Sequence, residues 1–316
     1  MTLTSAREPY VDEFVHEAAF YEGIEGFVAT NVEFVQAGLA RSEAVLVATD
    51  AARIEALRSA LGPAHEDVHF AEMARVGRNP GRIIAVWRDF LDRNSDRPVR
   101  GIGEPVWPGR HPDELVECQH HEHLLNHAFA SARGFWLRCP YDTTVLDTEV
   151  LVEATRSHPR CLGEPGTYLQ PFQPANARAI LGAALSAPIE PVRTWMVYVT
   201  NLADVRHELG ARAVDAGFDR ERVADIVLVA AELLANGLQH GSGQVSLNVW
   251  READRLTVEV VDGGFFDDPL AGRARPRPDT ASGRGLWIVH ELADLVQLRS
   301  DGRGTFVRAS FVLGAT

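Results

Sequence analysis

The sequence contains no lysine, so all 31 of its lysine-or-arginine side chains are arginines. This absence excludes a phosphate-binding loop of the G-x-x-x-x-G-K type, because that loop needs a lysine to reach the terminal phosphates. It also excludes any enzyme that forms a Schiff base through a lysine amine. If the protein binds ATP, it must hold the phosphates by another arrangement.

Cysteine is also scarce. Cys118, Cys139 and Cys161 are odd in number and far apart, so reduced thiols are expected rather than a disulfide framework. No apolar run approaches the roughly 18 residues that cross a bilayer, and the N-terminus lacks the pattern of a secretory signal. These absences predict a cytoplasmic protein. The formal net charge of −13 argues against direct nucleic-acid binding, which needs clustered cations.

The 316 residues are enough for two domains, and the pattern of expected strands and helices differs between the two halves of the chain. Up to residue 162, expected strands alternate with expected helices, which predicts an α/β domain with a mostly parallel sheet. The stretch 163–191 is rich in proline, glycine and alanine and indicates a linker with a short helix. In 192–316, paired strands and separate helices predict an α+β domain. The expected strands are 43–49, 67–73, 194–200, 243–252, 255–264 and two more within 295–313, and the segments 97–107 and 134–142 are each expected to be a strand followed by a loop. The expected helices are 51–61, 79–94, 111–130, 147–158, 202–217, 221–241 and 285–294.

The expected helix 221–241 is strongly apolar but carries polar residues at four-residue intervals: Glu232, Asn236 and His240. On a helix these three lie within about 80° of one another, so they share one face. An unpaired carboxylate in apolar surroundings is costly, and such groups usually persist because they bind something. Asn236 offers an oxygen to Mg²⁺, and Glu232 could take a proton from an attacking hydroxyl. His240 lies at the helix end, so two interpretations remain equally open for it: binding of a ligand, or a contact with the helix dipole.

Two glycine-bearing loops follow this helix in the sequence. Asp262 ends an apolar strand, and its carboxylate could accept a hydrogen bond from an exocyclic amine such as that of adenine, while Gly264 would let the backbone approach the base. Gly283 and Gly285 open an amphipathic helix, whose first backbone N–H groups could hold phosphate oxygens.

These motifs occur in one order: Glu232-Leu-Leu-Ala-Asn236, Asp262-Gly-Gly264, Gly283-Arg-Gly285-Leu286 and Gly304-Thr305. Residues 192–316 therefore resemble the GHKL superfamily of nucleotide-binding domains, which includes gyrase, histidine kinases and MutL. They are most similar to the bacterial anti-sigma-factor serine kinases of the RsbW type.

The resemblance implies ATP and Mg²⁺ as cofactors, with Asn236 on Mg²⁺, Asp262 on adenine and Glu232 as the base. It places Gly264, Gly283, Gly285, Leu286 and Thr305 around the nucleotide. It implies phosphorylation of a serine on an anti-anti-sigma (STAS-type) protein, sequestration of a sigma factor, or both, and a homodimer. One departure favours a binding switch without catalysis: Phe266 stands where the second glycine of D-x-G-x-G is expected.

The N-terminal half has its own candidate residues. Ligands of parallel sheets bind beyond the carboxyl ends of the strands, where Asp50, Glu72, Glu104 and the segment 139–142 are expected. Glu122 falls on the apolar face of the helix 111–130, which predicts a buried carboxylate. His120, His123 and His127 share the opposite face, where a metal site and a solvated polar face are the two readings.

The segments 16–23, 38–49, 103–110, 139–142 and 157–159 resemble the DcmR-type sensory domain called MEDS. The resemblance implies a RecA-like sheet without a phosphate loop and a sensor of small, hydrocarbon-like molecules. From it and from the strand ends, a sensory pocket is expected at His16, Tyr21, Glu104, Glu122, Tyr141 and Asp142.

Overall fold

The computed structural model describes residues 13–163, 169–174, 176–188, 191–276 and 283–314. The chain forms two compact units, each assembled from several stretches of sequence. Unit 1 comprises residues 1–75, 89–109 and 125–174, and unit 2 comprises 76–88, 110–124 and 175–316. Two helices, α4 (Ile83–Arg93) and α5 (Pro112–Ala128), contribute residues to both units.

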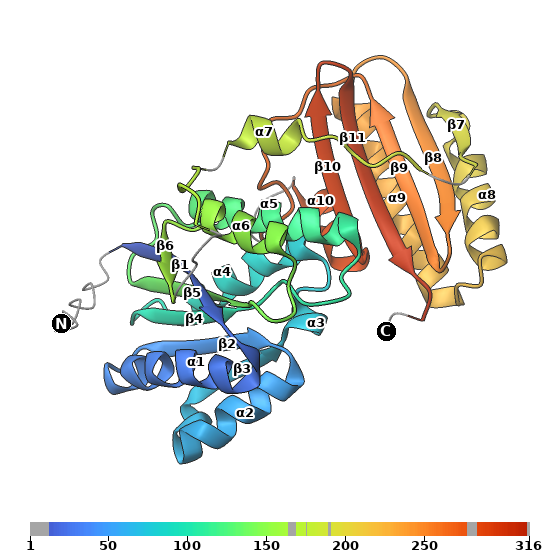
Figure 1. Ribbon diagram of the computed structural model, residues 1–316. Coiled ribbons are helices and arrows are strands. Elements are labelled where there is room, and N and C mark those ends of the chain that lie inside the picture. Colours follow the sequence, from blue (N-terminus) through green and yellow to red (C-terminus); the bar gives the residue numbers. More distant parts are fainter. Residues whose placement is uncertain (1–12, 164–168, 175, 189–190, 277–282, 315–316) are drawn as a thin grey trace. The chain divides into compact units, whose positions relative to one another are not determined.

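Unit 1 is built on a six-stranded sheet in the order β3-β2-β4-β5-β1-β6, and every pairing between its described strands is parallel (Figure 1). This confirms the expected parallel α/β architecture. Its described elements outside α4 and α5 are β1 (Phe14–Tyr21), α1 (Gly23–Ala40), β2 (Ala44–Thr49), α2 (Ala51–Leu61), η1 (Gly62–Asp67), β3 (Val68–Glu72), α3 (Met73–Val76, whose last residue falls in unit 2), β4 (Val99–Gly103), β5 (Phe135–Asp142), α6 (Thr148–Ser157) and β6 (Arg160–Leu162).

The central strands of this sheet are apolar because both of their faces are covered. All residues of β2, Ala44–Thr49, are buried, as a parallel strand between helix layers requires. The chain then turns into α2, whose N-terminus is capped by Asp50: Oδ1 accepts hydrogen bonds from Ala52 N (2.9 Å) and Arg53 N (3.0 Å). Such a cap satisfies N–H groups that have no partner inside the helix. It also places Arg53 at the carboxyl edge of the sheet.

Unit 2 is built on a five-stranded antiparallel sheet in the order β10-β11-β9-β8-β7. The two expected hairpins are confirmed, and Ala253 in the first turn has a positive φ of 51°. The remaining described elements are η2 (Pro80–Arg82), α7 (Ala177–Leu181), β7 (Arg193–Val197), α8 (Leu202–Asp215), α9 (Arg220–His240), β8 (Val245–Glu252), β9 (Arg255–Asp262), α10 (Arg284–Leu292), β10 (Leu295–Asp301) and β11 (Gly304–Val312).

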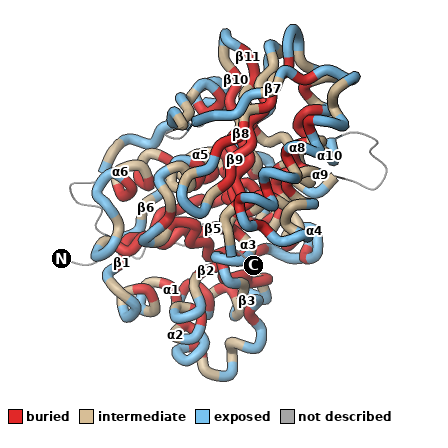
Figure 2. Tube along the Cα trace, turned by 90° about the vertical axis from the view of Figure 1, so that its right-hand side faces the viewer, coloured by how far each residue is buried: buried red, intermediate tan, exposed pale blue. Residues whose placement is uncertain are grey.

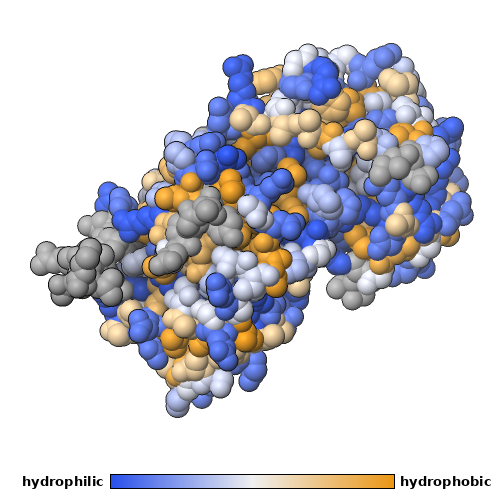
Figure 3. All heavy atoms as spheres, in the orientation of Figure 1, coloured by the Kyte–Doolittle hydropathy of each residue, from blue (hydrophilic) through white to orange (hydrophobic). Residues whose placement is uncertain are grey.

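Helices α8, α9 and α10 share one hydrophobic core with this sheet, whose strands β8 and β9 are largely buried (Figure 2). Helix α9 is long and apolar enough to cross a membrane by length and composition alone. Its apolar face, however, packs on the sheet through Ile226, Val229, Leu233 and Leu234, so it is a core helix of the unit. On the face shown in Figure 3, hydrophobic and hydrophilic residues are mixed.

Unit 2 also contains a buried group of charges around Glu117 of α5. Its carboxylate lies 2.5 Å from Arg299 Nη2 and 3.7 Å from Arg273 Nη2. Burial alone would raise the pKa of Glu117, but the nearby His120 and the charges of the two arginines lower it to about 2. His120, one of the three histidines considered for a metal, thus lies 3.6 Å from a buried carboxylate on its own helix.

Candidate functional site

Unit 2 contains a cavity of about 480 Å³ between the second half of α9, the end of β9, the start of α10 and β11. This volume lies within the range of small-ligand sites. The lining is mostly apolar, with a few polar groups. It comprises Leu233, Asn236, Gly237, His240, Gly241, Val260, Asp262, Gly264, Phe265, Phe266, Asp268, Leu270, Ala271, Gly272, Ala274, Gly283, Gly285, Leu286, Leu298, Thr305 and Val307.

Asp262 is the half-buried carboxylate of this cavity. It ends β9, where it pairs with Thr305 of β11, and its Oδ1 accepts a hydrogen bond from Gly264 N at 2.7 Å. Burial raises the pKa of Asp262 above its ordinary value, and the Gly264 N–H partly offsets that rise. A carboxylate held by one backbone donor in an apolar cavity retains capacity to accept a hydrogen bond from a ligand amine.

Glycine is required where backbone segments crowd around Asp262. A Cβ on Gly241 would lie 2.6 Å from Asp262 Oδ1 and 2.4 Å from the carbonyl oxygen of Gly237. A Cβ on Gly264 would lie 2.7 Å from the same carboxylate oxygen. Larger residues would therefore displace the carboxylate or close the cavity beside it.

The first turn of α10 contacts the polar face of α9. A Cβ on Gly285 would lie 2.8 Å from Glu232 Oε2 and 3.4 Å from Asn236 Nδ2. Gly283, the N-cap of α10, has a left-handed φ of 87° and makes no side-chain cap. The first N–H groups of α10 therefore lie beside Glu232 and Asn236 without a capping side chain from residue 283.

The hydroxyl groups of Thr305 and Ser300 form hydrogen bonds with the segment 264–266, which lines the cavity. Thr305 Oγ1 donates to the carbonyl oxygen of Gly264 (3.1 Å) and lies 3.2 Å from Ser300 Oγ, which accepts from Phe266 N (2.9 Å). Phe265, 69% exposed, lines the cavity beside Phe266. Phe266 thus stands at the position of the second glycine of the D-x-G-x-G pattern, and its backbone N–H donates a hydrogen bond to Ser300 of β10.

Seven residues expected around a nucleotide line this one cavity: Asn236, Asp262, Gly264, Gly283, Gly285, Leu286 and Thr305. Glu232 is half-buried and adjoins it through Gly285. His240, for which two readings stood open, is also in the lining. Motif spacing did not find the apolar and small residues of the segment 265–274, because nothing in their pattern differs from an ordinary loop. Their binding roles remain predictions.

In unit 1 the carboxyl ends of the strands meet at Glu104, which is buried. Tyr21 Oη donates to Glu104 Oε1 at 2.5 Å, and Thr49 Oγ1 donates to Glu104 Oε2. Burial raises the pKa of Glu104 to about 7, although Arg53 and the two hydroxyl donors act to lower it. Burial and the adjacent Glu104 also raise the pKa of Tyr21.

Arg53, which the sequence did not single out, joins these groups. Its Nε donates to Tyr21 Oη (2.8 Å), its Nη1 to Asp50 (2.5 Å) and its Nη2 to Asp142 (3.0 Å). Three of the six residues expected in a sensory pocket, Tyr21, Glu104 and Asp142, therefore come together through one arginine. The sequence position of Arg53 could have indicated its role, because Arg53 follows closely after Asp50, the helix-capping residue at the end of β2.

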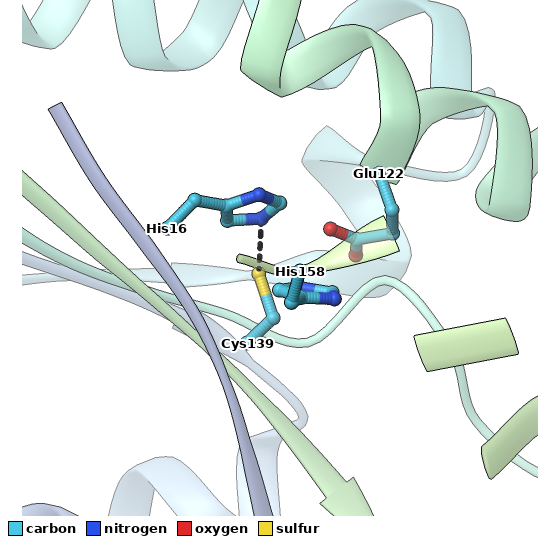
Figure 4. A group of neighbouring side chains, drawn as sticks. All are labelled: His16, Glu122, Cys139 and His158. Atoms are coloured by element: carbon cyan, nitrogen blue, oxygen red, sulfur yellow. Dashed lines mark hydrogen bonds between the residues drawn. The ribbon is translucent and has the colours of Figure 1, made fainter. Parts of the chain in front are cut away.

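Two of the other expected pocket residues, Tyr141 and His16, lie in a second group of unit 1. Tyr141 is buried and meets His158 edge-on, with ring centroids 5.7 Å apart. His158 in turn stacks against His16, with centroids 4.0 Å apart (Figure 4). Glu122, which belongs to unit 2, is buried, as its helical face predicted. Among the described residues, the donor atoms close enough for a metal are in this second group and not at His120, His123 and His127.

The sheet order, the layer of helices and the lined cavity define unit 2 as an α+β domain of the GHKL type, preceded by a parallel α/β domain. Comparison with family models agrees: residues 15–159 match "MEDS: MEthanogen/methylotroph, DcmR Sensory domain", and residues 198–311 match "Histidine kinase-like ATPase domain". The two matches, to a sensory domain and to an ATPase domain, together support a regulatory, ATPase- or kinase-like role.

No curated protein matches the chain. Among solved structures, it is similar to the RsbU and RsbW domains of Rv1364c from Mycobacterium tuberculosis, with 18% identity over 39% of this chain and 32% of that one, and a TM-score of 0.30. It is also similar to the histidine kinase AdeS of Acinetobacter baumannii, with 14% identity over 40% and 70% of the chains and a TM-score of 0.24. The chain thus spans about a third of the mycobacterial structure.

Proposed function

We propose that this protein is a cytoplasmic regulator of sigma-factor-dependent transcription. Its MEDS domain senses a small molecule, and its ATPase-like domain binds ATP and Mg²⁺ to phosphorylate a serine of a STAS-type anti-anti-sigma partner, to sequester a sigma factor, or both. The observation that carries the nucleotide part is the convergence of Asn236, Asp262 and the two glycine-bearing loops on one cavity.

The lining suits an adenine nucleotide. Asp262 would accept the exocyclic amine of the base, and burial gives that hydrogen bond added strength. Leu233, Leu286 and Leu298 offer apolar surface to the ring faces. Glycine at 264 and 285 lets the backbone lie close to the carboxylates of Asp262 and Glu232, which a Cβ would meet at 2.7 and 2.8 Å.

The polar face of α9 would serve the other end of the nucleotide. Asn236 supplies an oxygen for Mg²⁺, and the first N–H groups of α10 would hold phosphate oxygens. ATP supplies the phosphoryl group, and Mg²⁺ neutralises charge on it. Glu232, which lies beside Gly285, would accept the proton of a partner's serine hydroxyl.

In the domain that matches MEDS, we assign ligand recognition to the six expected residues: His16, Tyr21, Glu104, Glu122, Tyr141 and Asp142. The hydrogen-bonded group around Arg53 supports this, because a buried carboxyl with a raised pKa is typical of functional sites.

Two variants separate nucleotide binding from phosphoryl transfer. Asp262→Asn presents an amide where a carboxylate should accept the base amine, so ATP affinity should fall at least tenfold by calorimetry. Glu232→Gln should keep ATP affinity within about threefold but abolish transfer of labelled phosphate to STAS-type partners, since the amide cannot take the proton. Equal ATP affinity in wild type and Asp262→Asn would refute the assignment of the cavity.

A binding switch without catalysis is the second candidate, and the observation that favours it is Phe266 in place of the second glycine. In that case wild type would bind a sigma factor and transfer no phosphate to any STAS-type partner. Co-purification with sigma factors, measured alongside the transfer assay, distinguishes the two.

A further inference from the structure

One stretch of the unit 2 cavity lining is a loop, residues 265–274, which we call the wall segment. It contributes Phe265, Phe266, Asp268, Leu270, Ala271, Gly272 and Ala274 to the lining. A loop has fewer backbone hydrogen bonds to its surroundings than a strand has, so its position depends on the side chains that anchor it. The shape of the cavity therefore depends on what holds the two ends of the wall segment.

Both ends of the wall segment contact neighbouring elements of unit 2. At the start, Phe266 N donates a hydrogen bond to Ser300 Oγ of β10 at 2.9 Å. Near the end, Gly272 has a φ of 74°, and a Cβ on it would lie 2.7 Å from the Cβ of Leu286. The backbone of the wall segment thus lies directly against α10, whose first turn lines the same cavity.

A buried arginine connects the end of the wall segment with α5. Arg273 is 6% exposed, and its Nε donates to the carbonyl oxygen of Pro269 at 3.1 Å, which closes this part of the loop on itself. The Nη2 of the same guanidinium lies 3.7 Å from Oε2 of Glu117, which is 1% exposed. All three residues belong to unit 2. At 3.7 Å the contact is an ion pair and not a hydrogen bond, so it acts through charge.

The carboxylate of Glu117 is shared between two arginines. Its Oε1 accepts a hydrogen bond at 2.5 Å from Nη2 of Arg299, which is part of strand β10. Burial lowers the pKa of Arg273, Glu117 opposes this effect, and Arg299 adds to it. The two cations therefore repel each other, and the carboxylate compensates both. Because a buried charge without a partner is costly, removal of the carboxylate should drive out the arginine that can move, which is Arg273 in the loop.

We propose that Glu117 is a positioning residue of the nucleotide cavity: through Arg273 it holds the wall segment against α10, so that the cavity has its shape before a nucleotide enters. Neither side chain belongs to the cavity lining, so both act through the backbone of the wall segment. This inference rests on the proposed nucleotide binding, but the ion pair and the order of the loop exist without a ligand and are tested without one.

Hydrogen exchange of the full-length protein without nucleotide tests the anchor directly. Within the wall segment, the amide of Ala271 donates to the carbonyl oxygen of Asp268 at 3.2 Å, and the amide of Arg273 to that of Leu270 at 3.0 Å. In Glu117→Gln, both amides should exchange at least about tenfold faster than in wild type, because the loop opens locally when Arg273 leaves.

Glu114→Gln is the matched control for this measurement. Glu114 lies on the same helix and also pairs with a buried arginine of the sheet, since its Oε1 is 2.7 Å from Arg255 Nη2. Arg255 begins β9, whereas Asp262 at the cavity ends it. Exchange of the wall segment in Glu114→Gln should therefore equal that of wild type.

ATP affinity, measured by calorimetry, separates the anchor from a general loss of stability. Glu117→Gln leaves two buried cations without their shared carboxylate, so ATP affinity should fall at least about tenfold. Arg273→Gln removes one cation and leaves Glu117 paired with Arg299, so the loss should be only about threefold. Adding Arg273→Gln to Glu117→Gln should bring the affinity back to that of Arg273→Gln, because the repelled cation is gone. Two independent structural defects would instead add.

Arg273→Gln also carries the test if Glu117→Gln does not fold, because it leaves no cation without a counter-charge in this group. Its wall-segment amides should exchange faster than those of wild type. Unchanged exchange in either single variant, equal acceleration in Glu114→Gln, or a double variant that binds ATP more weakly than Glu117→Gln would each overturn the proposal. If wild type binds no ATP, the proposed function fails, and the exchange comparison alone decides whether Glu117 holds the wall segment.

Discussion

At the scale of single residues, the chain buries several groups that would be ionised in water, and their partners decide how each behaves. Glu104 has a pKa of about 7 because burial outweighs the lowering effect of Arg53, whereas Glu117 has a pKa of about 2 because its arginines and His120 outweigh burial. The difference lies in the neighbours, since both carboxyls are deeply buried. Sequence position alone does not separate these cases.

Glu104 should make stability depend on pH. Its folded-state pKa is raised from 4.5 to about 7, so its contribution is complete below pH 4.5 and is lost as pH rises toward 7. At about 1.4 kcal/mol per pH unit, the loss is about 3 kcal/mol. Chemical denaturation of wild type and Glu104→Gln at pH 5 and pH 7.5 should show the variant gaining about that much relative to wild type. The exposed Glu55→Gln is the matched control, and parallel pH profiles for all three would contradict the prediction.

At the scale of elements, most expected helices and strands are confirmed to within a few residues. The strand β1 and helix α1 were not assigned from periodicity. β1 carries buried polar residues, His16 and Glu17, inside an otherwise apolar run, so its pattern is not that of a core strand. Glu17 is buried because Arg138 of β5 donates to it at 2.7 Å, a long-range contact that no local pattern reveals.

The packing of α10 against α9 should control nucleotide access. Gly285→Ala places a methyl group 2.8 Å from Glu232 Oε2 and beside Asn236, so ATP affinity should fall at least tenfold by calorimetry. Helix stability should not suffer, because alanine favours a helix over glycine by about 1 kcal/mol. Gly302→Ala, in a turn with open space around the Cβ position, should bind ATP as wild type does. A full-affinity Gly285→Ala variant would argue against phosphates near this turn.

At the scale of the whole molecule, the two units are linked by continuous helices. Helices α4 and α5 each contribute residues to both units, so unfolding of one unit removes part of a helix from the other. The same helix α5 carries Glu117 in one buried group and Glu122 in another.

We therefore expect calorimetry to show one unfolding transition, and ATP with Mg²⁺ to raise its midpoint. At a ligand concentration 100 times the Kd, the stabilisation is about 2.7 kcal/mol. Asp262→Asn at the same concentration should show a smaller rise. Two separate transitions, only one of which responds to ATP, would contradict the coupling through α4 and α5.

The sequence by itself determined the two fold classes and the order of the nucleotide motifs, because periodicity, caps and glycine positions are local properties. It also placed Asp262, Asn236 and Gly285 on the correct elements. Only the tertiary structure decided which side chains meet: Arg53 with Tyr21 and Asp142, and His16 with Cys139 and His158. Those groups come from strands and helices far apart in sequence. Their chemistry depends on burial and mutual distance, which arise only when the parallel sheet brings its strands side by side.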